Sequence, residues 1–272
     1  MIKALFFDLD GTLLTGKKSI SPANRNALKK CRKKGIKVFA ATARSPMLDR
    51  MLGWTEEELS LFDGGVYCNG ALIVAEQNRT YEYLPTEAVQ VCIEETTRFE
   101  DVHFALHVEN EVHVFNHVMP DAALGFWGID RSDIAPLEGK WYDRTVKALI
   151  YRDSMMDARE PLPEELYERI VSRCGDKADI CLTDRGKTII AVSREAGKYS
   201  AIEKLRQQMG LEKDEIAVFG DDFNDMEMLS GYPNSVAMGN AVDEVKKIAG
   251  YITLTNDEDG VTYAIENILK IL

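Results

Sequence analysis

The chain has 272 residues, of which 45% are hydrophobic and 29% charged, and its formal net charge is −12 at pH 7. This composition is typical of a soluble globular protein, and the length suffices for a core domain with a smaller domain inserted into it. The acidic balance argues against a nucleic-acid partner, because contacts to a phosphate backbone require clustered positive charge.

The start of the chain predicts a strand–helix–strand unit. Residues 3–8 form a short apolar run ending in acid, which is typical of a buried strand. Ser21 and Pro22 predict the N-cap and first turn of a helix that runs to about residue 34, and residues 36–41 form a second apolar strand. In such a parallel unit, ligands bind at the carboxyl ends of the strands. Short strands are expected next at 66–68 and 72–75.

The pattern changes near Pro85. A helix is expected over 86–98, followed by strands at 102–108 and 111–117. The same order returns later as a helix over 163–174 and strands at 179–183 and 188–192, with one further strand at 146–151 between the two groups. Repeated helix–strand–strand units predict a sheet with helices on one face, and therefore a separate α+β domain.

The α/β alternation resumes after residue 194. We expect a helix over 198–209, a strand at 216–220, a helix over 223–230, strands at 235–238 and 251–254 separated by a helix, and a last helix from about 259. The predicted fold class is therefore α/β. A parallel-sheet, Rossmann-like core is formed by residues 1–84 and 191–272, and residues 85–190 are inserted as an α+β cap domain.

Two acidic segments follow strands of the predicted core. In FDLDGT, Asp8 and Asp10 lie two residues apart at the end of a strand, so an extended chain directs both carboxylates to one side. In GDDFND, Asp221, Asp222 and Asp225 fall within five positions, although capping a helix requires only one acid. Such clustered carboxylates repel one another unless a cation lies between them, and their hard oxygens favour Mg²⁺. The alternative for each segment is a polar turn that is simply solvated.

Two further residues are informative only beside these acids. Thr42 follows the second strand, where its hydroxyl and the next backbone N–H could hold a phosphate oxygen. Lys198 begins a predicted helix, where a lysine opposes the helix dipole but would neutralise a nearby anion. Alone, each would be interpreted as an ordinary loop or surface residue.

The order of these four segments resembles that of the haloacid dehalogenase superfamily, and in particular the Cof-type sugar-phosphate phosphatases with an inserted α+β cap. VYCNGALI, GNAVDEVKKIA and NDEDGVTYAI resemble further signatures of that subfamily, so the resemblance covers nearly the whole chain. It implies that Asp8 is the nucleophile and that Asp10 is the general acid/base. The implied Mg²⁺ ligands are Asp8, Asp221 and the backbone carbonyl of Asp10. Asp225 is implied to lie next to these ligands without binding the ion itself. The implied phosphate-binding residues are Leu9, Thr42, Ala43, Lys198 and Asn224.

Two positions depart from the pattern of the family. Ala43 stands where glycine is usual, which keeps the backbone donor but constrains the loop. Asp222 replaces a small hydroxyl residue, and the sequence suggests no role for it.

The resemblance implies a magnesium-dependent phosphatase that hydrolyses sugar phosphates or similar phosphomonoesters through an aspartyl-phosphate on Asp8. The alternatives are a phosphomutase of the same superfamily and a phospho-accepting signalling module. Asp10 argues against the signalling module, because an acid at that position supports turnover. The expected partner is a small phosphorylated metabolite, and the sequence does not identify which one.

All four histidines, His103, His107, His113 and His117, fall in the predicted hairpin at 102–117. They alternate with apolar residues, so we expect them to face the substrate cleft or solvent rather than to bind a metal. The five cysteines are scattered without a CxxC pair, which favours reduced thiols and a cytoplasmic protein. No apolar run reaches membrane-spanning length, so no membrane partner is expected, and the chain is expected to be a monomer or a weak homodimer.

Overall fold

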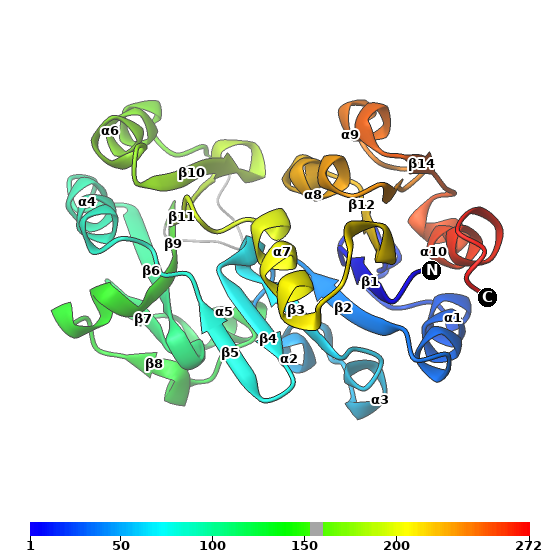
Figure 1. The fold of residues 1–272 in the computed structure, drawn as a ribbon. Helices are drawn as coiled ribbons and strands as arrows, with labels where there is room; N and C mark the ends of the chain where they lie inside the picture. Colours follow the sequence, from blue (N-terminus) through cyan, green and yellow to red (C-terminus); the bar gives the residue numbers. More distant parts are fainter. Residues whose placement is uncertain (153–159) are drawn as a thin grey trace. The chain divides into compact units, whose positions relative to one another are not determined.

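The computed structural model describes residues 1–152 and 160–272. The chain divides into two compact units (Figure 1). The core unit comprises Met1–Thr80 and Gly197–Leu272, and the inserted unit comprises Tyr81–Ala196. The ends of the inserted unit lie a few residues outside the boundaries expected from the sequence.

The core unit is built on an eight-stranded sheet with the order β14-β13-β12-β1-β2-β3-β4-β5. From β14 to β3 the neighbouring strands are parallel, and β4 turns back antiparallel to β3. The strands are β1 (Ala4–Phe7), β2 (Lys37–Ala41), β3 (Gly64–Tyr67), β4 (Leu72–Ala75), β5 (Asn78–Tyr81), β12 (Ile216–Gly220), β13 (Asn234–Ala237) and β14 (Tyr251–Ile252). The α/β fold class expected from the sequence is confirmed.

Helices cover both faces of this sheet (Figure 1). They are α1 (Pro22–Lys33), α2 (Leu48–Leu52), α3 (Glu56–Leu59), α7 (Lys198–Met209), α8 (Met226–Gly231), α9 (Asp243–Ile248) and α10 (Gly260–Tyr263). On one face, Phe6 and Val218 pack with Ile202 of α7 and Leu229 of α8. Leu5 is equally buried and points to the opposite face, because side chains alternate along a strand.

Local sequence explains where these elements begin. The Ser21 side chain accepts a hydrogen bond from the Asn24 N–H, and Pro22 occupies the first turn, so α1 starts where the sequence predicted. The segment expected as one helix over 223–230 begins instead with a single 3₁₀ turn, Phe223–Asp225, before α8. The short helices α2 and α3 and strand β5 were not predicted, because each has too few residues to show a periodic pattern.

The inserted unit contains a six-stranded sheet with the order β10-β11-β9-β6-β7-β8. Its strands are β6 (Val102–Val108), β7 (His113–Phe115), β8 (Ile134–Ala135), β9 (Thr145–Arg152), β10 (Ala178–Thr183) and β11 (Thr188–Ser193), and its helices are α4 (Thr86–Thr96), α5 (Asp121–Trp127) and α6 (Glu164–Cys174). The pairs from β10 to β7 are antiparallel, and β8 is parallel to β7. Helix α5 and strand β8 were not predicted.

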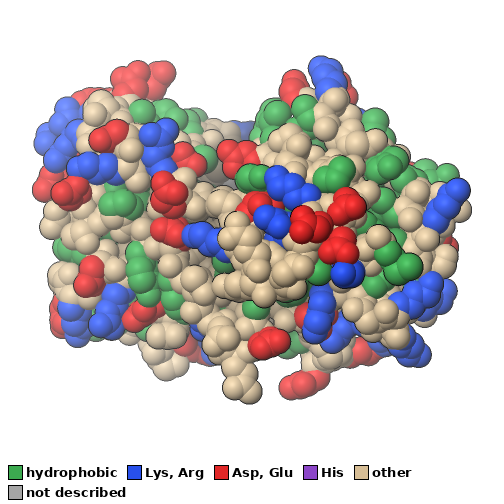
Figure 2. Space-filling model, in the orientation of Figure 1, with side chains coloured by type: hydrophobic (Ala, Val, Ile, Leu, Met, Phe, Trp, Pro, Cys, Tyr) green, Lys and Arg blue, Asp and Glu red, His purple; other side chains and the backbone are tan. Residues whose placement is uncertain are grey.

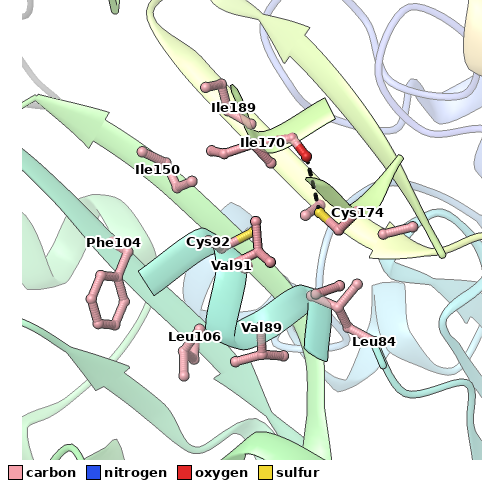
Figure 3. Packing of buried hydrophobic residues seen from close by; sticks show 14 of the residues in the cluster. Leu84, Val89, Val91, Cys92, Phe104, Leu106, Ile150, Ile170, Cys174 and Ile189 are labelled. Carbon is pink, nitrogen blue, oxygen red and sulfur yellow. Dashed lines mark hydrogen bonds between the residues drawn. The ribbon is translucent and has the colours of Figure 1, made fainter. Parts of the chain in front are cut away.

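Helices α4 and α6 pack on one face of this sheet and form the core of the inserted unit. Cys92 of α4 and Ile170 of α6 pack in one cluster with Phe104 of β6 and Ile150 of β9 (Figure 3). Cys174 donates a hydrogen bond from its thiol to the carbonyl oxygen of Ile170, one helical turn away, at 3.2 Å (Figure 3). Side chains alternate along β6, so Phe104 and Leu106 face these helices, whereas His103 and His107 face the other side of the sheet.

The surface carries charges of both signs. On the face shown in Figure 2, Asp and Glu side chains are interspersed with Lys and Arg, without a continuous basic surface. Within residues 1–152 and 160–272, every helix is too short or too polar to cross a bilayer. The five cysteines are free thiols, and Cys181 is the exposed one.

Candidate active site

Three strand ends bring the predicted acidic residues and Thr42 to one edge of the core sheet. Asp8 follows β1, Thr42 follows β2, and Asp221 follows β12. Because β1 lies between β2 and β12 and is parallel to both, the carboxyl ends of these strands are adjacent. Asp8 and Thr42 are buried, and Asp221 is half-buried.

The side chain of Lys198 links two of the carboxylates. Its Nζ donates hydrogen bonds to Oδ1 of Asp8 and to Oδ1 of Asp225, each at 2.6 Å. The Lys198 side chain is only 1% exposed, so this ion pair lies in a region from which water is excluded. Lys198 is the first residue of α7, as predicted, and Gly197 before it is the N-cap.

A third carboxylate completes the group. Oxygen atoms of Asp8, Asp221 and Asp225 lie within 4.8 Å of one another. Three carboxylates around one ammonium leave an excess of negative charge, and a divalent cation would balance it. Oxygen donors of this kind fit Mg²⁺.

Burial changes the pKa values of the charged groups in this site. Burial raises the pKa of Asp8 to about 8, against the lowering effect of Lys198, and the charges of Asp225 and Asp221 add to the increase. Burial also raises the pKa of Asp221 to about 6, although a hydrogen bond from Thr12 opposes it. For Lys198, burial lowers the pKa, but the two carboxylates outweigh this effect and raise it overall.

Asp225 is fully engaged by the protein. Its Oδ1 accepts from Lys198, and its Oδ2 accepts from the backbone N–H groups of Asp221 and Asp222 at 2.9 and 3.2 Å. Asp225 thus accepts three hydrogen bonds from the protein, whereas Asp8 and Asp221 each accept one from a side chain, so Asp225 is better placed to orient Lys198 and the Asp221 loop than to bind an ion. Asp222 has a local role, because its carboxylate accepts from the Phe223 N–H and caps the 3₁₀ turn.

The turn after Asp10 requires a glycine. Gly11 has φ +83°, and a Cβ on it would lie 2.8 Å from Cγ of Asp221 and closer still to its Oδ2. The next residue, Thr12, donates from Oγ1 to Oδ1 of Asp221 at 2.7 Å. The Asp-Gly-Thr sequence therefore fits the first catalytic loop against the loop that carries Asp221.

The residues expected to bind phosphate occupy several loops of the core unit. Leu9 is buried between the two acids, and Ala43 is exposed beside the buried Thr42. Among the described residues, the non-glycine positions with positive φ do not include Ala43, so alanine fits this loop without that strain. Asn224 is exposed and donates from Nδ2 to Oδ1 of Asn69 at 3.2 Å.

Asp10 is held by two cations that the sequence did not single out. Arg44 donates from Nε to Oδ2 at 2.6 Å and from Nη2 to Oδ1 at 2.8 Å, and Lys18 donates from Nζ to Oδ1 at 2.7 Å. Burial raises the pKa of Asp10, but these hydrogen bonds and charges outweigh it and hold the pKa below the ordinary value. Arg44 lies two residues after Thr42 in AATARS, and that proximity was the available signal.

Residues of three other motifs contact the loops that carry the site residues. Asn240 of GNAVDEVKKIA donates from Nδ2 to the Gly11 carbonyl oxygen at 2.8 Å. Asn256 of NDEDGVTYAI donates to the Leu14 carbonyl oxygen at 2.8 Å. Gly70 of VYCNGALI approaches the residue before Lys198 so closely that a Cβ would come within 2.6 Å of the Gly197 nitrogen.

The histidines lie on the second face of the sheet in the inserted unit. The rings of His107 and His113 stack with their centroids 4.5 Å apart, and those of His103 and His117 lie 4.1 Å apart with their planes tilted by 31°. His107 and His113 are 5% and 3% exposed, so the expectation that they face a cleft or solvent is wrong for this pair. Burial lowers the pKa of His107 well below its usual value, with the charges of His113 and Lys147 acting in the same direction.

The fold and the arrangement of the acids agree with the result of comparison with known families. Residues 5–265 match the family described as haloacid dehalogenase-like hydrolase. The chain belongs to this family. The resemblance noted in the sequence is thereby confirmed.

Similar proteins span the full length of the chain. Phosphatase YwpJ of Bacillus subtilis is 27% identical, over 98% of this chain and 100% of its own. The 5-amino-6-(5-phospho-D-ribitylamino)uracil phosphatase YcsE of the same organism is 29% identical, over 98% and 95%. The crystal structure of a haloacid dehalogenase-like hydrolase from Bacteroides thetaiotaomicron superposes with a TM-score of 0.80 at 27% identity, covering 98% of this chain and 100% of that one. The predicted enzyme class, a phosphoric monoester hydrolase, is confirmed.

Proposed function

We propose that this family member is a magnesium-dependent phosphatase of small phosphorylated metabolites and that it carries the phosphoryl group transiently on Asp8. The observation that carries the proposal is the Lys198 ammonium, which binds Asp8 and Asp225 in a buried site next to Asp221. A nucleophilic carboxylate that must approach an anionic phosphate needs such positive charge beside it.

The metal would be held by Asp8, Asp221 and the backbone carbonyl of Asp10. Oδ1 of Asp8 is bound by Lys198 and Oδ1 of Asp221 by Thr12, so Oδ2 of each remains for a cation. When bound, Mg²⁺ supplies charge neutralisation at the phosphate and at Asp8. Asp225 would orient Lys198 and the Asp221 backbone without touching the ion.

In the first step an Asp8 oxygen attacks phosphorus, and the bond from phosphorus to the leaving oxygen breaks in line with it. For this step Asp10 must carry a proton, against the lowering effect of Arg44 and Lys18 on its pKa, and it gives that proton to the leaving oxygen, so the leaving group departs as an alcohol. Thr42, Asn224 and the N–H groups of Leu9 and Ala43 would bind the phosphoryl oxygens. Each lies in a loop of the core unit.

In the second step water attacks the aspartyl-phosphate. Asp10, now a carboxylate, takes a proton from the water as the new oxygen–phosphorus bond forms, and Asp8 is released as a carboxylate. The net reaction converts one ester and one water into an alcohol and inorganic phosphate. Because Asp10 regains its proton in this step, the enzyme returns to its starting state.

We assign this chemistry to residues 1–84 and 191–272, and the choice of leaving group to the cap at residues 85–190. Sugar phosphates, pyridoxal phosphate and flavin mononucleotide are candidate substrates. The phosphorylated ribitylaminouracil in the name of YcsE joins them because that enzyme is similar along the whole chain. A cytoplasmic location would suit such metabolites.

Phosphate release from a panel of these esters tests the proposal. Wild-type protein should release phosphate with Mg²⁺ and lose this activity in excess chelator, and Asp8→Asn should be inactive because an amide cannot form the acyl-phosphate. Asp222→Asn is the matched control, since it removes an acid from the same region while asparagine still caps the turn. Wild-type turnover without metal, or full activity of Asp8→Asn, would contradict the proposal. Transfer of phosphate between positions of a sugar, without release, would indicate a phosphomutase.

A further inference from the structure

The hydrogen bonds around Asp10 extend this mechanism to a residue not yet assigned to it. We propose that Arg44 is a positioning residue that fixes the Asp10 carboxyl group for proton transfer to the leaving oxygen. The inference rests on the proposed phosphatase function. It is carried by the geometry of the Arg44–Asp10–Lys18 cluster.

Arg44 fixes the plane of the Asp10 carboxyl group. Two parallel hydrogen bonds, Nε to Oδ2 at 2.6 Å and Nη2 to Oδ1 at 2.8 Å, join a planar guanidinium to a planar carboxyl group. A fork of this kind sets direction as well as distance. Lys18 makes a single bond from a side chain that is 55% exposed, whereas the Arg44 side chain is 21% exposed.

The backbone of Arg44 is itself held by the loops around the site. Its N–H donates to Oγ1 of Thr42 at 3.1 Å, and its carbonyl oxygen accepts from the Cys68 N–H at 2.9 Å. Arg44 therefore connects the loop after β2 to the loop after β1, where Asp10 lies. The carboxyl group is oriented relative to the same loop that would bind the phosphate.

The bonds distinguish the two oxygens of Asp10. Oδ1 accepts from both Arg44 and Lys18, whereas Oδ2 accepts from Arg44 alone. A carboxylate oxygen has about two lone-pair sites, so Oδ2 keeps one for a proton. We therefore assign Oδ2 as the atom that gives the proton to the leaving oxygen when its bond to phosphorus breaks, and that later takes a proton from water.

This role makes the importance of Arg44 depend on the leaving group. An alkoxide is a poor leaving group and needs the proton, whereas p-nitrophenolate departs readily without one. General acid catalysis contributes roughly 10²–10⁴-fold where it is needed. A misoriented Asp10 should therefore slow alkyl phosphates much more than p-nitrophenyl phosphate.

The test compares kcat and KM of wild type and Arg44→Ala for the best alkyl phosphate of the panel and for p-nitrophenyl phosphate. We expect kcat for the alkyl ester to fall at least about tenfold more than kcat for the aryl ester. Added guanidinium should restore part of the alkyl activity of Arg44→Ala. Arg44→Lys should remain impaired on the alkyl ester, because an ammonium cannot form the fork.

Arg206→Ala is the matched control. Arg206 makes the same two-bond contact with Glu203, both bonds at 3.0 Å, near the far end of α7 from Lys198. It should leave the ratio of the two rates unchanged. Thermal unfolding of each variant checks that the fold is retained, and Arg44→Lys provides the comparison if Arg44→Ala does not fold.

Two results overturn the inference. Equal losses on the two esters, or full activity of Arg44→Lys on the alkyl ester, would show that Arg44 does not orient Asp10 for proton transfer. In either case an active wild-type enzyme leaves the proposed function intact. Wild-type protein that releases phosphate from no ester would instead overturn the proposed function, and this inference with it.

Discussion

Replacing Gly11 by alanine tests how the first catalytic loop fits against Asp221. The substitution has two separable consequences. Gly11 has φ +83°, and alanine in such a left-handed conformation costs roughly 1–2 kcal/mol of folding free energy. The new Cβ would also lie 2.8 Å from Cγ of Asp221, so that side chain must move.

Gly35 separates the two consequences. It has φ +80°, and a Cβ there would meet nothing within 4 Å. Gly35→Ala should therefore show the backbone cost alone, about 1–2 kcal/mol in urea-induced unfolding. Gly11→Ala should show at least that loss, and in addition a weaker response to Mg²⁺.

The assay measures the free energy of unfolding of wild type and both variants with and without Mg²⁺. An ion that binds only the folded state adds about 1.4 kcal/mol when its concentration is ten times Kd. Wild type and Gly35→Ala should gain this increment at the same Mg²⁺ concentration, and Gly11→Ala should gain clearly less. An equal gain in all three proteins would refute the idea that the close fit of Gly11 positions Asp221 for the metal.

Three further predictions concern the metal site and the inserted unit. Asp221→Asn should weaken Mg²⁺ binding, measured by calorimetry, more than Asp225→Asn, because Asp225 already accepts three hydrogen bonds from the protein; the opposite order would make Asp225 the ligand. In chelator, the pKa of Asp221 is about 6 in the folded protein and about 4 in the unfolded chain. The folded state therefore holds this proton more tightly, and the stability that the proton contributes is lost as pH rises from about 4 to 6. Wild type should therefore lose more unfolding free energy over that range than Asp221→Asn, and parallel curves would exclude the effect. In the inserted unit, Ile170→Ala should lower the free energy of unfolding in urea by about 2–5 kcal/mol. Val171 is 37% exposed on the same helix, so Val171→Ala should lower it by under about 1 kcal/mol. Similar losses in the two variants would argue against the packing of α6.

The sequence predicted those parts of the fold that have a long local pattern. Helix α7 and strands β6 and β12 have the predicted bounds, because an apolar run or helical periodicity extends over their whole length. The 3₁₀ turn at Phe223–Asp225 was missed, because its start depends on the hydrogen bond from the Phe223 N–H to the Asp222 carboxylate. A helix and a capped turn have similar compositions.

For the site, the sequence indicated which acids gather at the strand ends but not how they are connected. Asp8 and Lys198 could be proposed from their places in the motifs. The contact of Arg44 with Asp10 could not, because it depends on the direction in which the loop after β2 turns. The burial of His107 was likewise hidden, since alternating residues identify two faces of a strand without showing what covers either.

The order of the strands has a consequence for synthesis of the protein. β1 is made long before β12, with which it pairs on one side, because β12 begins only at Ile216. Until that part of the chain leaves the ribosome, one edge of β1 has no native partner, and an unpaired apolar edge is prone to aggregation. Lys198 and Asp221 are also made late, because both belong to the second segment of the core unit, Gly197–Leu272. Nascent chains that stall before β12 should therefore depend on chaperones and should lack activity altogether.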